Sequence, residues 1–150
     1  MKSHSRTSHQ NRDLELARVL VVDDDPTSRL TLQTVLEAGG YHVDAAASAA
    51  EAVGKLDEQE YQLVLSDLQM ESPEAGLKVL AHARNMEYKP ATAIVTSYRN
   101  AQPQKQSQKQ SHASRALIEP EDVPGLLSKV ANLISERAAR RLQRELRHAT

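Results

Sequence analysis

Val19-Leu20-Val21-Val22-Asp23-Asp24-Asp25-Pro26 is the stretch of this 150-residue chain that most constrains its architecture. Its four apolar residues form an uninterrupted, mostly β-branched run, which is typical of a strand covered on both faces, as in the centre of a parallel sheet. Three carboxylates and a proline follow at once. They fall just past the carboxyl end of the strand, where open α/β sheets bind their ligands.

The three consecutive aspartates have two interpretations at this point. Adjacent carboxylates repel one another unless a positive charge lies between them, and a hard divalent cation with oxygen ligands suits that role. The alternative is an acidic turn that only caps the next helix. Asp25 is the expected N-cap of that helix, because Pro26 is favoured at the first helical position.

The rest of the chain alternates short apolar strands with amphipathic helices. We expect strands at 18–22, 41–45, 63–65, 91–95 and 116–118. The intervening helices are predicted from four sets of residues: Leu32, Val35 and Leu36, ended by Gly39-Gly40; a Ser48 to Glu51 capping box followed by Ala52, Val53 and Leu56; Leu77, Leu80 and Ala81; and Leu126, Leu127, Val130, Leu133 and Ile134. This alternation predicts an α/β fold, a doubly wound parallel sheet with helices on both faces.

Composition bounds the class of protein. The chain has no Phe or Trp, so its core must consist of Leu, Val, Ile and Ala, and it has no Cys, which excludes disulfides and thiolate metal sites. Its apolar runs are far too short to span a membrane, and residues 1–10 lack the apolar region of a secretory signal. We expect a cytoplasmic protein with a polar, basic tail (1–16), one domain (17–135) and an arginine-rich helical extension (136–150).

Charge is distributed unevenly along the chain. Residues 1–12 and residues 136–150 each carry +3, which leaves −7 on the residues between them. In the extension, Ala138, Leu142 and Leu146 form a thin apolar stripe at helical spacing, surrounded by arginines. The extension is a solvated tail, a helix that forms a homodimer, or a contact for an acidic partner. Direct DNA binding is not expected, because no helix-turn-helix pattern is present.

Residues 100–114 interrupt the pattern. Glutamine recurs at every second position from 102 to 110, mixed with lysine and serine. A helix is expected here from the topology, but it would have no apolar face to bury. We expect a mobile connection or a weakly held helix.

Polar groups end three of the expected strands. Asp23 and Asp24 follow the first strand, Asp67 the third and Thr96 the fourth, and parallel strands bring their carboxyl ends to one edge. Convergent carboxylates and a hydroxyl suit magnesium and phosphoryl chemistry. A carboxylate can attack phosphorus, a metal can neutralise the charge of the transferring group, and a hydroxyl can donate to a phosphoryl oxygen.

The segments VLVVDDDP, LVLSDLQM, AIVTS and LIEP, in this order, resemble the receiver domain of two-component response regulators over roughly Ala17 to Ser135. The resemblance implies a flavodoxin-like, five-stranded sheet of order 2-1-3-4-5. It implies that Asp23 and Asp24 bind Mg²⁺ and that Asp67 is the phospho-acceptor. It also implies that the backbone carbonyl of Gln69 is a further metal ligand and that Thr96 is the switch hydroxyl.

Three features depart from the family pattern. Glu119-Pro120 stands where the family has Lys-Pro, Ala116 stands at the place of the switch aromatic, and the loop 70–76 is one residue longer than usual. The lysine would make a charge-assisted contact to the phosphoryl group worth roughly 1.5–3 kcal/mol. Either switching is poorly coupled in this chain, or Glu119 turns outward and Lys89, Arg99 or Arg115 supplies the cation.

The expected function is that of a stand-alone receiver, a signalling module and not an enzyme. It would accept phosphate from a histidine kinase or a histidine phosphotransfer protein and act on a downstream protein target. The alternative is a pseudo-receiver, an interaction module whose state does not depend on phosphorylation. A magnesium-dependent phosphatase is disfavoured, because Gln69 stands where a second catalytic acid would be.

Overall fold

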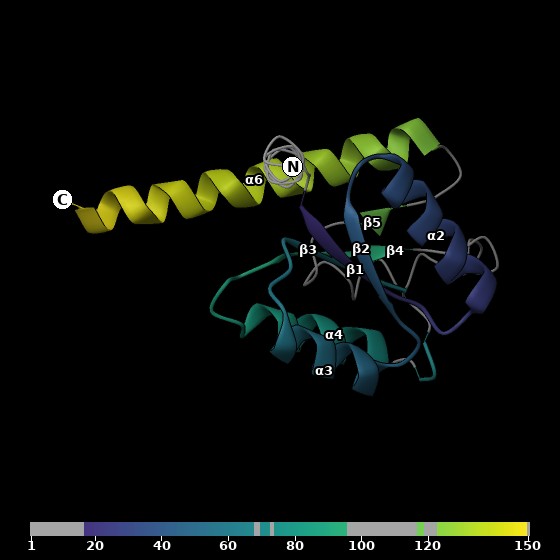
Figure 1. Ribbon diagram of the computed structural model, residues 1–150. Coiled ribbons are helices and arrows are strands. Elements are labelled where there is room, and N and C mark those ends of the chain that lie inside the picture. The colour runs from purple at the N-terminus through teal and green to yellow at the C-terminus, as the bar shows by residue number, and fades with distance from the viewer. Residues whose placement is uncertain (1–16, 68–69, 73, 96–116, 119–122, 150) are drawn as a thin grey trace, which may run out of the picture.

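The computed structural model describes residues 17–67, 70–72, 74–95, 117–118 and 123–149. They form a parallel sheet of five strands in the order β2-β1-β3-β4-β5, flanked by four helices (Figure 1). The fold class and strand order expected from the sequence are therefore confirmed. The elements are β1 (Arg18–Val22), α2 (Pro26–Ala38), β2 (His42–Ala46), α3 (Ala49–Glu58), β3 (Leu63–Asp67), α4 (Ala75–Arg84), β4 (Ala91–Val95), β5 (Leu117–Ile118) and α6 (Val123–Ala149).

The sheet separates two apolar clusters, and alternate residues of each strand face opposite sides. On β1, Leu20 and Val22 join the cluster beneath α3 and α4, whereas Val19 and Val21 join the cluster beneath α2 and α6. Figure 1 shows these two helix pairs on opposite faces of the sheet. All four side chains are at most 1% exposed, as the uninterrupted apolar run predicts for a central strand. The prediction of a purely aliphatic core was incomplete, because three buried tyrosines, Tyr41, Tyr61 and Tyr88, add aromatic bulk to it.

The helix ends follow the predicted capping chemistry. The Asp25 carboxylate accepts a hydrogen bond from the Ser28 N–H at 3.0 Å, and Pro26 is the first residue of α2. That helix ends at Ala38 with Gly39 as its C-cap, and Gly40 has a φ of 102°, a conformation that residues with a Cβ rarely adopt.

The second capping site differs in one detail from the expected capping box. Ser48 caps α3 by accepting from the Glu51 N–H. The Glu51 carboxylate, however, accepts from the N–H of Ala47 rather than from that of the N-cap residue.

The buried face of α4 differs from the expected one. Leu80 is buried, but Leu77 is 43% exposed and Ala81 is exposed. The buried stripe runs instead through small side chains and one valine: Ala75, Gly76, Val79 and Ala83. The prediction gave weight to the large apolar residues, whereas the small ones face the sheet and α3.

Helix α6 is the longest element and leaves the body of the protein part-way along its length. Its 27 residues span about 40 Å. Leu126 and Val130 are buried against the sheet, while Leu142 and Leu146, farther along, are 56% and 58% exposed. Figure 1 shows the C-terminal half of α6 projecting beyond the sheet. The helix runs unbroken across the boundary that the sequence suggests between residues 135 and 136.

Within the described residues, no helix combines the length and the apolar character that crossing a bilayer requires.

Candidate metal site

The carboxyl ends of β1 and β3 bring three carboxylates together. Val22 is in register with Ser66, so the residues that follow them, Asp23 and Asp67, lie side by side. One carboxylate oxygen from each of Asp23, Asp24 and Asp67 lies within 4.8 Å of the other two. Asp23 and Asp67 are each only 3% exposed, whereas Asp24 is exposed. The site therefore has a buried floor and one side chain open to solvent.

Backbone hydrogen bonds hold the turn that carries this site. The Asp25 N–H donates to Oδ1 of Asp23 at 2.9 Å, and the Asp23 N–H donates to the Ala46 carbonyl at 3.1 Å. Arg29, one turn into α2, donates from Nη1 to the Asp23 carbonyl at 2.9 Å. These contacts fix both the backbone and the carboxylate of Asp23.

Electrostatics favour a cation at this place. Burial raises the pKa of Asp23 above its ordinary value, and the Asp24 and Asp25 carboxylates raise that pKa further. The Asp25 N–H and the Asp67 side chain act in the opposite direction. Concentrated negative charge with only oxygen donors is the ligand environment that Mg²⁺ prefers in proteins. The donor set thus fits a divalent metal, and Asp23, Asp24 and Asp67 would hold it.

A cavity of about 190 Å³ opens beside the buried pair, between α2 and α6. Asp23 and Asp67 line it together with apolar side chains, among them Leu32, Val95 and Leu126. Three hydroxyl side chains of α2 also line it, so small groups can approach the two carboxylates in surroundings that are both polar and apolar.

Only some of the candidate site residues from the sequence lie within the part of the chain that the structure describes. The structure brings together Asp23, Asp24 and Asp67. Gln69, Thr96, Ala116, Glu119, Arg99 and Arg115 lie outside the described residues, as does the segment 100–114. The prediction that Lys89 could replace the family lysine was wrong. Lys89 precedes β4 and so lies at the amino edge of the sheet, where its Nζ donates to the Arg84 carbonyl.

Arg29 was missed by the sequence reasoning. It lies in the first turn of α2, where a cation is disfavoured by the helix dipole. The signal in the sequence was an arginine at this unfavourable position, four residues after the last of three consecutive aspartates. It could have pointed to the contact between Arg29 and Asp23.

The model of the response regulator receiver domain matches residues 19–131. The chain belongs to this family. Receiver domains are signalling modules of two-component systems, bind Mg²⁺ at an acidic pocket, and interact with histidine kinases and downstream effectors. The resemblance seen in the sequence is thereby confirmed.

Curated relatives share only part of their length with this receiver. It is 31% identical over 119 residues to the transcriptional regulatory protein ZraR of Escherichia coli, which covers 79% of this chain and 25% of ZraR. It is 37% identical over 78 residues to the transcriptional regulatory protein ResD of Bacillus subtilis, which covers 52% of this chain and 31% of ResD. The receiver thus spans less than a third of either relative.

Solved structures show the same fold. A response regulator receiver domain protein of Methanospirillum hungatei is 26% identical with a TM-score of 0.71, covering 84% of this chain and 99% of that one. TrrA of Thermotoga maritima, in complex with Mg²⁺ and beryllium fluoride, is 29% identical with a TM-score of 0.63, covering 79% of this chain and 99% of that one. NtrX of Brucella abortus, at 20% identity and a TM-score of 0.75 over 87% of this chain and 29% of that one, shows the fold alone.

Proposed function

We propose that this receiver accepts a phosphoryl group on Asp67 from a histidine kinase or a histidine phosphotransfer protein in the cytoplasm. The convergence of three carboxylates at the ends of β1 and β3 carries this proposal. The similar receiver TrrA was crystallised with Mg²⁺ and beryllium fluoride, and we carry both ligands over to this chain. Asp23, Asp24 and Asp67 hold the Mg²⁺ with the Gln69 carbonyl, and Thr96 acts as the switch hydroxyl.

The transfer follows from the placement of Asp67. A carboxylate oxygen attacks the phosphorus of a phosphohistidine, the P–N bond breaks as the new O–P bond forms, and the imidazole leaves as it takes up a proton. The bound Mg²⁺ supplies charge neutralisation for the transferring group. The cavity beside Asp23 and Asp67 gives the phosphoryl group room.

Output then passes through contact with a downstream protein. The second candidate is a pseudo-receiver, which binds its partner regardless of the state of Asp67. Glu119 in place of the family lysine favours it, because a carboxylate near a phosphoryl dianion repels that group instead of binding it.

Hydrogen exchange of the full chain, with and without Mg²⁺ and beryllofluoride, tests this function. Slower exchange at the carboxyl ends of β1 and β3 is expected, together with a change at a distant element such as α4 or α6. Asp67→Asn is the control and should remove both effects. A local effect without the distant change identifies the pseudo-receiver, and no effect at all rejects the proposed chemistry.

A further inference from the structure

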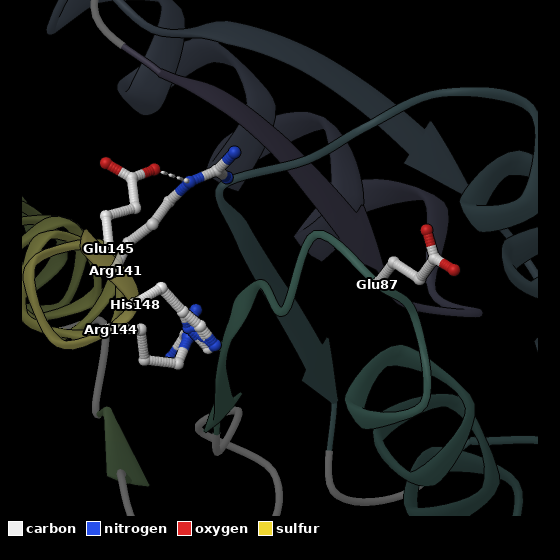
Figure 2. Close-up of a pocket in the computed structure, with 5 residues that line it drawn as sticks. All are labelled: Glu87, Arg141, Arg144, Glu145 and His148. Carbon is white, nitrogen blue, oxygen red and sulfur yellow. Dashed lines mark ion pairs between the residues drawn. The ribbon is translucent and has the colours of Figure 1, made fainter. Parts of the chain in front are cut away.

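The projecting part of α6 and the turn between α4 and β4 form the walls of a second pocket, away from the acidic site. Its volume is about 640 Å³, and it is lined by Glu87, Arg141, Arg144, Glu145 and His148. Figure 2 shows Arg141, Arg144 and His148 projecting from α6 on one side of the gap, and Glu87 on the other. The hollow is largely open to solvent, so a segment of a partner protein can reach it.

Arg137 ties the two walls together. Its side chain is almost completely buried, and it donates from Nη2 to the Tyr88 carbonyl at 2.6 Å and from Nε to the Lys89 carbonyl at 3.0 Å. Arg137 lies one helical turn before Arg141, and Tyr88 directly follows Glu87. The Tyr88 hydroxyl in turn donates to the Leu56 carbonyl at 2.9 Å. The pocket is therefore held open by fixed contacts and needs little rearrangement to bind.

The basic wall has a regular spacing. Arg141, Arg144 and His148 occupy positions i, i+3 and i+7, so they share one side of α6 and span about 10 Å along its axis. Arg141 pairs with Glu145 at 3.7 Å, but both side chains are largely exposed. Such an exposed pair contributes little and can be exchanged for a contact with a partner.

We propose that this pocket binds an acidic helical segment of a partner protein, whose carboxylates are spaced i, i+3 and i+7 to meet Arg141, Arg144 and His148. Charge complementarity with this side of α6 carries the choice of partner, since hydrogen bonds between Arg and carboxylate are charge-assisted. Of the two glutamates in the lining, one is already paired with Arg141 and the other lies on the opposite wall, so only the side of the partner that faces α6 needs to be acidic. The proposal is independent of phosphoryl transfer at Asp67.

Other anionic occupants fit less well. A nucleic-acid backbone is negative on all sides and would therefore also meet Glu87, whereas a helix can present carboxylates to α6 alone. An anionic membrane would require a broad apolar face next to the arginines. The exposed Leu142 and Leu146 lie on another side of the helix and are only two.

Fluorescence anisotropy with the full chain tests the proposal. The probe is a labelled, alanine-based helical peptide with three glutamates at i, i+3 and i+7, compared with a permuted peptide whose glutamates point in three directions. We expect the patterned peptide to bind about fivefold more tightly than the permuted one. Arg141→Ala with Arg144→Ala should weaken binding at least about fivefold. Arg140→Ala with Arg147→Ala removes the same charge outside the pocket and should change binding less than about twofold.

Three results would overturn the proposal. The first is evidence of only a general attraction between charges. It would be seen as an equal loss of binding in both double variants or as equal binding of the two peptides. The second is tighter binding of a DNA duplex or of phosphatidylserine vesicles, abolished by the Arg141 and Arg144 changes, which assigns the pocket to another occupant. The third is that the wild-type chain does not bind the patterned peptide at low salt, although its circular dichroism shows a folded α6. Asp67→Asn should leave peptide binding unchanged.

Discussion

Asp23 and Asp67 lie side by side at the ends of two neighbouring parallel strands, with carboxylate oxygens within 4.8 Å of each other and almost no exposure to solvent. Two buried carboxylates this close are costly without a compensating charge. The same arrangement should therefore destabilise the metal-free protein and favour the binding of a cation. Function and stability are opposed at this point of the molecule.

Asp23→Asn should uncouple stability from magnesium. In the wild type, Mg²⁺ at ten times its Kd should raise the free energy of unfolding by about 1.4 kcal/mol. Asn at position 23 removes one charge of the cluster, so the metal-free variant should be at least as stable as the wild type and respond little to Mg²⁺. Urea unfolding with and without Mg²⁺ measures this. Glu58→Gln, an exposed change on α3, is the matched control, and a full magnesium response in Asp23→Asn would refute the site.

Arg137→Ala should destabilise the fold. The change leaves the carbonyls of Tyr88 and Lys89 without the donors that they have now. Loss of two hydrogen bonds from a charged group should cost about 3–6 kcal/mol, and Arg137→Lys should recover part of it. Urea unfolding compares these variants with Arg140→Ala, an exposed arginine of the same helix, which should stay within about 0.5 kcal/mol of the wild type. Equal effects at 137 and 140 would contradict the buried role.

Replacing Gly54 or Gly40 with alanine should change the stability of the protein in opposite directions. Gly54 lies inside α3, and a Cβ added there meets nothing within 4 Å, so Gly54→Ala should stabilise the protein by about 0.5–1 kcal/mol. Gly40 has a φ of 102°, and Gly40→Ala should destabilise it by about 1–2 kcal/mol. Thermal unfolding measures both variants. Midpoints shifted in the same direction would contradict the backbone conformations at these two glycines.

Tyr88 should make stability fall at alkaline pH. Burial is the main cause that raises its pKa from 10.0 to about 12. Between these values the folded protein keeps a proton that the unfolded chain releases, so the contribution of this residue is lost as pH rises through 12. In Tyr88→Phe the hydroxyl is absent. The stability difference between wild type and variant should therefore shrink from pH 9 to pH 12 in urea unfolding, and a constant difference would exclude the linkage.

The sequence predicts the strands well because each is a short apolar run bounded by turn residues. β1 and β4 have the expected ends, and Asp25, Pro26 and Gly39 bound α2 as their capping preferences require. The acidic cluster was predictable for a different reason, because the topology brings the carboxyl ends of parallel strands to one edge.

Long-range contacts of charged side chains were not predictable. The sequence does not distinguish Arg137 from the other arginines of the extension, although it lies seven residues after Val130 on the buried side of α6. Only the position of the α4–β4 turn, with two carbonyls free to accept, explains its burial. The same holds for His82, whose contact with Asp57 at 2.8 Å joins α4 to α3. Lys89 shows the converse error, because its place before β4 puts it at the wrong edge of the sheet.

The most direct test of the central claim is the intact mass of the full chain after incubation with acetyl phosphate and Mg²⁺. The wild type should gain the mass of one phosphoryl group, and it should gain none when Mg²⁺ is removed by chelation or when Asp67 is replaced by Asn. An adduct that persists in Asp67→Asn, or a wild type that remains unmodified with Mg²⁺ present, would contradict the assignment of Asp67 as the phospho-acceptor.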